Sequence, residues 1–296
     1  MTDVHTPPSS LSGIRTAFLL NLAFTLFEIA GGLWTNSIAI LADALHDLGD
    51  SFALGAAWYL EKISGRKGDA RYSYGYRRFS LVGALISAGV LVAGSLLIVT
   101  EAVPRLLHPV RAHAPGMIVL AVVGCVVNGV AALRLRRTSG FNARMVAWHL
   151  AEDALGWLAI LVAGAVLLVR DVPALDPALS ILITLWVLWN VVRNLRRTMG
   201  VFLQGTPEDV DLPALEAELR GIEGISDLHH THVWSMDGVH HVFTAHGVIA
   251  EHATKADQLR IKAAIQQAVA RYGIAHATVE LEYADERCGI RHENCR

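Results

Sequence analysis

The sequence is poor in charged residues and in cysteine. Charged side chains make up 18% of its 296 residues, against about 25% in soluble domains. The net charge is −2 and no basic stripe with interleaved aromatic residues is present, so we expect no nucleic-acid partner. The three cysteines, Cys125, Cys288 and Cys295, are too few and too unevenly placed for a disulfide framework.

Apolar residues, by contrast, are abundant: they make up 53% of the chain, and the mean hydropathy is +0.41. Six apolar stretches of roughly 20 residues are each long enough to span a bilayer. They lie near residues 14–34, 37–60, 80–102, 116–135, 145–169 and 177–195. The first has no A-x-A cleavage site, so we expect a retained membrane helix and not a cleaved signal peptide. The sequence predicts an α-helical membrane protein with six transmembrane helices over residues 14–200, preceded by an N-terminal segment of residues 1–13.

Basic residues gather in alternate connections between these stretches. Lysine and arginine are frequent after the second stretch, after the fourth and at the end of the sixth, while the other connections are short or poorer in them. Basic loops remain on the cytoplasmic side of a membrane. We therefore expect a multi-pass protein of the cell membrane, the inner membrane in bacteria, with both termini in the cytoplasm.

The character of the chain changes near residue 205. An amphipathic stretch is followed by two strand-like segments joined at Asp237-Gly238, a hairpin signal. A second amphipathic stretch ends at Gly273, and an alternating segment follows. This order predicts a small cytoplasmic α+β domain, αββαβ and ferredoxin-like, over residues 205–285, with helices on one face of a short sheet. A tail of residues 286–296 follows it.

Two matching ionisable motifs interrupt the apolar stretches. His46 and Asp50 lie in the second stretch, and His149 and Asp153 lie in the fifth. The i, i+4 spacing places both side chains of a pair on one face of a helix. One such residue is more often a hydrogen-bonded packing residue, but ionisable groups in a membrane span are costly and indicate a functional site. Two identical motifs in separate spans strengthen that interpretation.

Two histidines and two aspartates from two helices suit a tetrahedral site for a divalent cation. Zinc accepts imidazole nitrogen and carboxylate oxygen and prefers four ligands. The two histidines favour zinc, with cadmium and cobalt as alternatives, whereas an all-carboxylate site would favour manganese or magnesium. Histidine titrates near neutral pH, so protons compete with the metal for these ligands and give a physical basis for metal/proton exchange.

Three further acids lie beside the motifs. Asp43 precedes His46 by three residues and shares roughly its helix face, so it is a candidate for a supporting carboxylate. Asp47 and Glu152 are expected to point away from the pairs and not to be ligands.

This pattern resembles the cation diffusion facilitator family of metal/proton antiporters, zinc-transporting type. The paired HxxxD motif carries the resemblance, which extends over nearly the whole chain. Weaker matches support it: Asn21, Glu28, Gly31-Gly32, the YSYGYRR run ending at Arg78, and Asn128. The resemblance implies that the two motifs form the transport site, and that the protein is a homodimer held partly through its cytoplasmic domains.

The C-terminal region is rich in possible metal ligands. They are His229, His230, His232, His240, His241, His246, Glu280, Glu282, Cys288, His292 and Cys295. The resemblance selects His229, His232 and His246, with Glu280 and Glu282 on the last strand. The tail, with Cys288, His292 and Cys295, is a candidate source of thiolate ligands. Zn²⁺ bound here would regulate transport; the alternative is a solvated surface without a metal site.

We therefore predict secondary active efflux of Zn²⁺ from the cytoplasm in exchange for protons, by alternating access. Efflux of Cd²⁺ or Co²⁺ by the same mechanism is the nearest alternative. A membrane metal sensor that binds without transport would use the same sites. An intramembrane metalloenzyme is a third class, but the sequence has no HExxH motif and no Ser or Cys nucleophile constellation, so we expect no enzyme.

Overall fold

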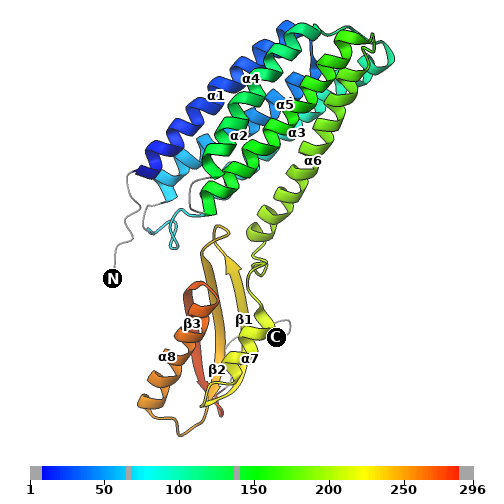
Figure 1. Ribbon diagram of the computed structural model, residues 1–296. Helices are drawn as coiled ribbons and strands as arrows, with labels where there is room; N and C mark the ends of the chain where they lie inside the picture. The colour runs from blue at the N-terminus through cyan, green and yellow to red at the C-terminus, as the bar shows by residue number, and fades with distance from the viewer. Residues whose placement is uncertain (1–8, 65–67, 137–140, 287–296) are drawn as a thin grey trace. The chain divides into compact units, whose positions relative to one another are not determined.

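The computed structural model describes residues 9–64, 68–136 and 141–286. Its first part is a bundle of six long helices (Figure 1). They are α1 (Ser9–Thr35), α2 (Ile38–Ser64), α3 (Phe79–Leu107), α4 (Ala114–Arg136), α5 (Phe141–Val169) and α6 (Leu175–Phe202). Five of them are long and apolar enough to cross a membrane by length and composition. The sixth, α2, has 27 residues but includes three aspartates and a histidine. The predicted class, a six-helix membrane domain followed by a small α+β domain, is confirmed.

The helices pack through small residues and an apolar cluster. Met117 and Leu120 of α4 and Trp157 and Ile160 of α5 are buried together with the start of α2. A Cβ atom added at Gly124 would lie 2.2 Å from the Trp157 ring, so α4 approaches α5 closely because this position has no side chain. Large apolar side chains are exposed on the outside of the bundle, as expected where lipid surrounds it.

Helix α2 follows α1 after only two residues. Asn36 adopts a left-handed backbone conformation, with φ of 52°, which asparagine tolerates at the C-terminus of a helix. The backbone N–H of Ser37 then donates to the carbonyl of Gly32 at 3.0 Å. This tight turn makes α1 and α2 sequential neighbours and fixes where α2 begins.

The C-terminal domain has the predicted element order. Its elements are α7 (Leu212–Arg220), β1 (Ile225–Ser235), β2 (His241–Ile249), α8 (Lys255–Arg271) and β3 (Ile274–Tyr283) (Figure 1). The sheet order is β1-β2-β3, with β1 antiparallel and β3 parallel to the central strand β2. The chain divides into two units, residues 1–62 with 82–195 and residues 63–81 with 196–296.

One apolar core joins the helices of this domain to its sheet. Leu215 and Leu219 of α7, Phe243 of β2, and Ile261 and Ile265 of α8 are all buried in it. The two buried residues named in each helix are four positions apart and so lie on one helix face, and this apolar face of each helix covers the sheet.

The predicted hairpin between β1 and β2 is confirmed. Gly238 has a positive φ of 92°, which glycine adopts without steric cost. The Asp237 carboxylate accepts hydrogen bonds from the backbone N–H groups of Val239 and His240, at 3.0 and 2.8 Å. These local bonds set the antiparallel register that places the histidines of β1 beside those of β2.

Candidate metal centre

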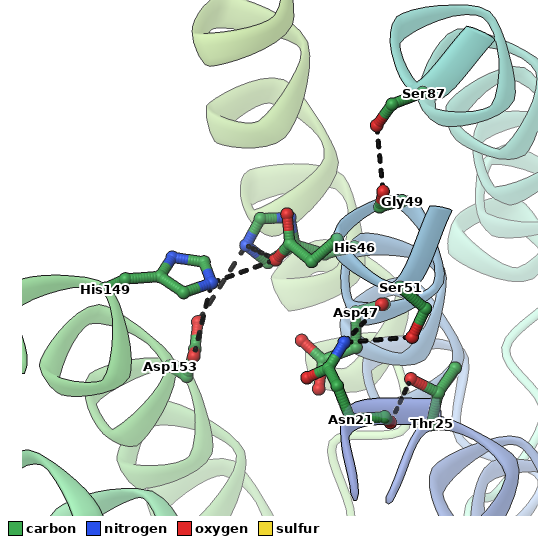
Figure 2. Close-up of polar contacts among 10 residues, drawn as sticks. Asn21, Thr25, His46, Asp47, Gly49, Ser51, Ser87, His149 and Asp153 are labelled. Atoms are coloured by element: carbon green, nitrogen blue, oxygen red, sulfur yellow. Dashed lines mark hydrogen bonds and ion pairs between the residues drawn. The ribbon is translucent and has the colours of Figure 1, made fainter. Parts of the chain in front are cut away.

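The four residues of the two HxxxD motifs lie together in the helical bundle. Figure 2 shows His149 and Asp153 facing His46. The Nε2 atom of His149 lies 3.0 Å from Asp50 and 3.8 Å from Asp153. The Nε2 atom of His46 lies 3.7 Å from Asp50 and 3.9 Å from Asp153. Each histidine therefore faces both carboxylates, one from its own helix and one from the other.

These distances suit a single tetrahedral ion. With metal–ligand bonds of about 2.0–2.1 Å, neighbouring ligand atoms of a tetrahedral zinc site lie about 3.3–3.4 Å apart. The four nitrogen–oxygen distances lie between 3.0 and 3.9 Å. Donor atoms of His46, Asp50 and His149 lie within 4.8 Å of one another, and those of His46, Asp47 and Asp153 form a second such group, so Asp153 meets the first three through its contacts with the two histidines.

Solvent reaches this group through a cavity of about 470 Å³ between α2, α5 and α6. Trp186, Asn190 and Asn194 of α6 line it together with the ligands. The His149 side chain is 42% exposed, whereas that of Asp153 is only 9% exposed. His149 is therefore the more accessible of the two α5 residues, and Asp153 the more enclosed.

Side chains from two neighbouring helices fix the position of α2. Asn21 of α1 donates through its amide nitrogen to the backbone carbonyl of Asp47 at 3.0 Å and to the Ser51 hydroxyl at 2.9 Å. The hydroxyl of Ser87 on α3 donates to the carbonyl of Gly49 at 2.8 Å (Figure 2). These bonds flank the turn of α2 that carries His46 and Asp50, so they orient these two candidate ligands.

Three further carboxylates, those of Glu28, Asp43 and Asp47, are buried in the bundle. Asp47 was expected to point away from the motifs, but one of its oxygens lies within 4.8 Å of donor atoms of His46 and Asp153. Asp43 is buried and faces Gly156 of α5, where an added Cβ atom would lie 3.3 Å from its carboxylate. Glu28 of α1 is fully buried. Helical spacing alone does not reveal these acids as a group, because they come from different helices.

The N-terminal part of the chain matches the family model of the cation efflux transmembrane domain over residues 14–203. The chain belongs to the cation efflux family. Zinc transporter ZitB of Pectobacterium atrosepticum is 31% identical over 298 residues, which cover 98% of this chain and 92% of the relative. ZitB of Escherichia coli K12 is 32% identical over 290 residues, which cover 95% and 91%. The cadmium, cobalt and zinc/H(+)-K(+) antiporter of Bacillus subtilis is 27% identical over 282 residues, which cover 94% and 91%.

Membership in the cation efflux family supports a multi-pass membrane transporter rather than an enzyme. Both HxxxD motifs fall inside the matched segment. The alignments with the relatives cover most of the C-terminal domain as well, because they extend over more than nine-tenths of the chain.

The C-terminal domain of this cation efflux protein holds a second group of metal-binding residue types. His229 Nε2 lies 3.2 Å from Glu282, and His246 Nδ1 lies 2.5 Å from the other oxygen of the same carboxylate. Donor atoms of these three residues lie within 4.8 Å of one another. Glu280 is more exposed and lies 3.7 Å from His246 Nε2. Adjacent strands produce this group, since His229 pairs with His246 and His246 pairs with Glu280.

The remaining C-terminal candidates lie elsewhere. His232 is exposed and lines a different hollow, beside Trp234 and Thr244. His230, in contrast, is buried against the His229 and His246 rings. Burial, with the neighbouring imidazoles, lowers the pKa of His230 below its ordinary value. The predicted tail ligands Cys288, His292 and Cys295 lie outside the described residues.

Two further candidate histidines, His240 and His241, each contact an aspartate outside the group around Glu282. His240 Nδ1 lies 2.7 Å from Asp237 in the hairpin. His241 is buried with its Nε2 atom 3.1 Å from Asp209, and this hydrogen bond lowers the pKa of the Asp209 carboxyl. These contacts give His240 and His241 structural partners away from the group around Glu282.

Proposed function

We propose that this protein exports divalent metal cations, chiefly Zn²⁺, from the cytoplasm in exchange for protons. The observation that carries the proposal is the close approach of His46, Asp50, His149 and Asp153, with four nitrogen–oxygen distances of 3.0–3.9 Å. Four ligand atoms from two helices form a binding site that small movements of α5 against α2 would create or dissolve. Such a site is suited to alternating access, in which the ion must be bound and then released.

The choice of metal rests on the ligands and on the relatives. Two imidazoles and two carboxylates fit zinc, and cobalt and cadmium follow. Two of the relatives are named zinc transporters, and another is named for cadmium, cobalt and zinc. Zn²⁺ is therefore the proposed main cargo, with Cd²⁺ and Co²⁺ as alternatives.

Proton exchange follows from the histidines. A histidine that binds metal must be deprotonated, so a proton at His46 or His149 excludes the ion. Protons entering from outside would therefore expel the metal and reset the site, and the name of the Bacillus relative includes proton exchange.

We infer an orientation with both termini in the cytoplasm. The basic connections support it through the positive-inside rule. In that orientation the end of α6 that carries Asn194 lies on the cytoplasmic side, and the cavity lined by Asn190 and Asn194 is the proposed route by which the ion is loaded. We further propose a location in the bacterial inner membrane and a homodimer, as the family resemblance implies.

The C-terminal domain is proposed to bind a regulatory ion. The donors present fit Zn²⁺, because both carboxylate oxygens of Glu282 face imidazole nitrogens, one of His229 and one of His246. Glu280 lies beside this set, and Cys288, His292 and Cys295 of the tail, outside the described residues, are further proposed ligands. An ion bound there would cross-link β1, β2 and β3 and stabilise the domain when cytoplasmic metal is plentiful.

Zn²⁺ flux into proteoliposomes under an imposed pH gradient tests the transport proposal. The wild type should show flux that depends on the gradient. Asp153→Ala removes an almost fully buried ligand and should reduce flux to that of protein-free vesicles while the purified protein remains folded. Glu101→Ala is the control, since this exposed carboxylate of α3 lies outside the ligand group, and it should transport normally.

The same experiment separates a transporter from a sensor. Normal flux in Asp153→Ala would contradict the site assignment. Saturable Zn²⁺ binding by the wild type without any flux would indicate a membrane metal sensor, provided that a known zinc exporter transports in the same vesicles.

A further inference from the structure

Strand β1 contains a bulge among its histidines. His229 pairs with His246, and the next pair is His232 with Thr244. Strand β1 thus advances three residues while β2 advances two, so one residue of β1 is extra. His230 lies in this bulge with a positive φ of 49°, a conformation that is uncommon for any residue other than glycine.

The bulge turns His230 into the domain. Regular alternation would place His229 and His230 on opposite faces of the strand, yet His230 is only 7% exposed and its ring contacts both neighbouring imidazoles. Its Nδ1 atom is buried and has no hydrogen-bond partner among the residues that the structure describes. A buried nitrogen without a partner is unfavourable, and an ion in the adjacent group would provide one.

The three imidazoles have the spacing of ligands around one metal. The ring centroids are 5.1 Å apart for His229 and His230, 5.2 Å for His230 and His246, and 5.5 Å for His229 and His246. A zinc–nitrogen bond of about 2.0–2.1 Å places a ring centroid about 3.2 Å from the metal, so tetrahedral imidazole ligands have centroids about 5.1–5.3 Å apart. The observed triangle of ring centroids matches this value on all three sides to within a few tenths of an ångström. The donor atoms that lie within 4.8 Å of one another belong to His229, His246 and Glu282, so the His230 ring would rotate to bring a nitrogen to the ion.

We propose that His230 is a ligand of the C-terminal metal site and completes a three-histidine, one-carboxylate set with His229, His246 and Glu282. This inference rests on the regulatory site proposed above and names a ligand for it. The strained backbone at residue 230 is the means by which the third imidazole reaches the set. His232, two residues further along the strand, lies on the exposed side and does not take part.

The donor set has a consequence for what the domain detects. Three neutral imidazoles and one carboxylate favour zinc and cobalt, whereas magnesium, calcium and manganese prefer oxygen ligands. A site with one carboxylate among four ligands would respond to Zn²⁺ against a large excess of Mg²⁺. His230 would therefore increase both the affinity and the selectivity of the regulatory site.

Binding of Co²⁺ to the full-length protein in detergent tests the assignment. All variants would carry His46→Ala, Asp153→Ala, Cys288→Ser and Cys295→Ser. Because His46 belongs to both groups of candidate donors in the bundle, neither these groups nor the tail thiolates then obscure the signal. Two changes remove the imidazole without adding strain: His230→Gly accommodates a positive φ, and His230→Asn tolerates it. The controls are His232→Ala, on the same strand but outside the group, and His246→Ala, within it.

Both His230 variants should bind Co²⁺ at least about 10-fold more weakly than the background protein, and the ligand-field absorption bands of the bound ion should change. His232→Ala should bind within about 2-fold of the background. The stabilisation of His230→Gly by Co²⁺, measured as the rise in unfolding temperature over the metal-free variant, should be smaller than that of the background protein.

Two other outcomes would be decisive. Unchanged Co²⁺ affinity and spectrum in both His230 variants, with binding lost in His246→Ala, would overturn the role of His230 and leave the regulatory site in place. Unchanged binding in His246→Ala would show that the regulatory site itself does not exist, and the assignment of His230 would fail with it.

Discussion

Asp176, at the start of α6, should be critical for the stability of the helical bundle. Its carboxylate accepts a hydrogen bond from the Ser37 hydroxyl at 2.5 Å and from the backbone N–H groups of Ile38 at 2.8 Å and Ala39 at 3.4 Å. It is only 2% exposed. A carboxylate at the N-terminus of α2 satisfies backbone donors that have no partner within the helix and interacts favourably with its dipole.

Asp176→Asn keeps the shape of this side chain but replaces one acceptor oxygen by a donor. One N–H or O–H group at the start of α2 is then left buried without a partner, at a cost of about 1–3 kcal/mol. Loss of the negative charge at the helix terminus adds about 0.3–1 kcal/mol. We expect a total loss of about 1.3–4 kcal/mol, which corresponds to roughly 3–16 °C in the unfolding temperature for domains of this size.

The assay is thermal unfolding of the purified protein in detergent, with Asp171→Asn as the matched control. Asp171 lies on the same side of the bundle, but it is exposed and pairs with exposed Arg111, so its change should cost at most about 1 kcal/mol. Zn²⁺ flux should also fall in Asp176→Asn, because α2 carries His46 and Asp50. Equal unfolding temperatures for the two variants would refute the assignment of Asp176 as the cap of α2.

Two further changes test the packing and the loop chemistry. Gly124→Ala should lower the free energy of unfolding by about 1–3 kcal/mol through overpacking against Trp157. Gly129→Ala on the same helix should be neutral or stabilising, because an added Cβ atom there meets nothing within 4 Å. Equal effects of the two changes in thermal unfolding would argue against close packing of α4 on α5. The pKa of Asp69 lies below its ordinary value because the carboxylate accepts hydrogen bonds from the Tyr76 hydroxyl and two backbone N–H groups. Its contribution is therefore complete above the ordinary carboxyl pKa of about 3.9 and is lost as the pH falls through the lowered value. Hydrogen exchange of residues 68–79, corrected for intrinsic rates, should show protection lost on acidification at a higher pH in Tyr76→Phe than in the wild type; an identical pH dependence would exclude the tyrosine contact as the cause.

The sequence predicts the helices and the domain topology because both depend on local periodicity. Six apolar runs identify six helices, but the helices extend beyond the runs: α6 continues to Phe202 and α2 to Ser64. Hydropathy marks only the part of a helix that contacts lipid, while backbone hydrogen bonding continues into the polar flanks. The αββαβ order follows in the same way from alternation and from the Asp237-Gly238 turn.

Contacts between helices are less accessible to sequence reasoning. Asp176 appears in the sequence as one acid in a short connection, yet it is buried against the start of α2 because α6 crosses that helix end. Asp47 is about 100° around the helix from His46, but α5 packs where it can face both. The spacing of side chains along one helix does not determine where a neighbouring helix packs against it.

The histidines of β1 show a second limit. Alternation along a regular strand groups every second residue, and the family pattern selects His229 and His232. The bulge adds one residue and reverses the alternation beyond it, so His230 joins His229 and His246 while His232 lies on the exposed side. Bulges depend on pairing with the neighbouring strand, and no single residue in the run HHTH signals one.

Several polar residues of the neighbouring helices form hydrogen bonds with α2. It is the helix with too many acids to qualify as an apolar span, so its cost in a membrane must be offset by partners inside the bundle. Asp176 of α6 holds its first turn, while Asn21 of α1 and Ser87 of α3 hold its middle. Helix α5 contacts α2 through His149 and Asp153, which face Asp50 and His46. These contacts join ionisable side chains, unlike the hydrogen bonds from Asp176 to the backbone at the start of α2. The hydrogen bonds that anchor α2 thus come from α1, α3 and α6, whereas the side chains that face His46 and Asp50 come from α5. A change in the α2–α5 contact can therefore alter the proposed metal site while the anchoring bonds stay intact.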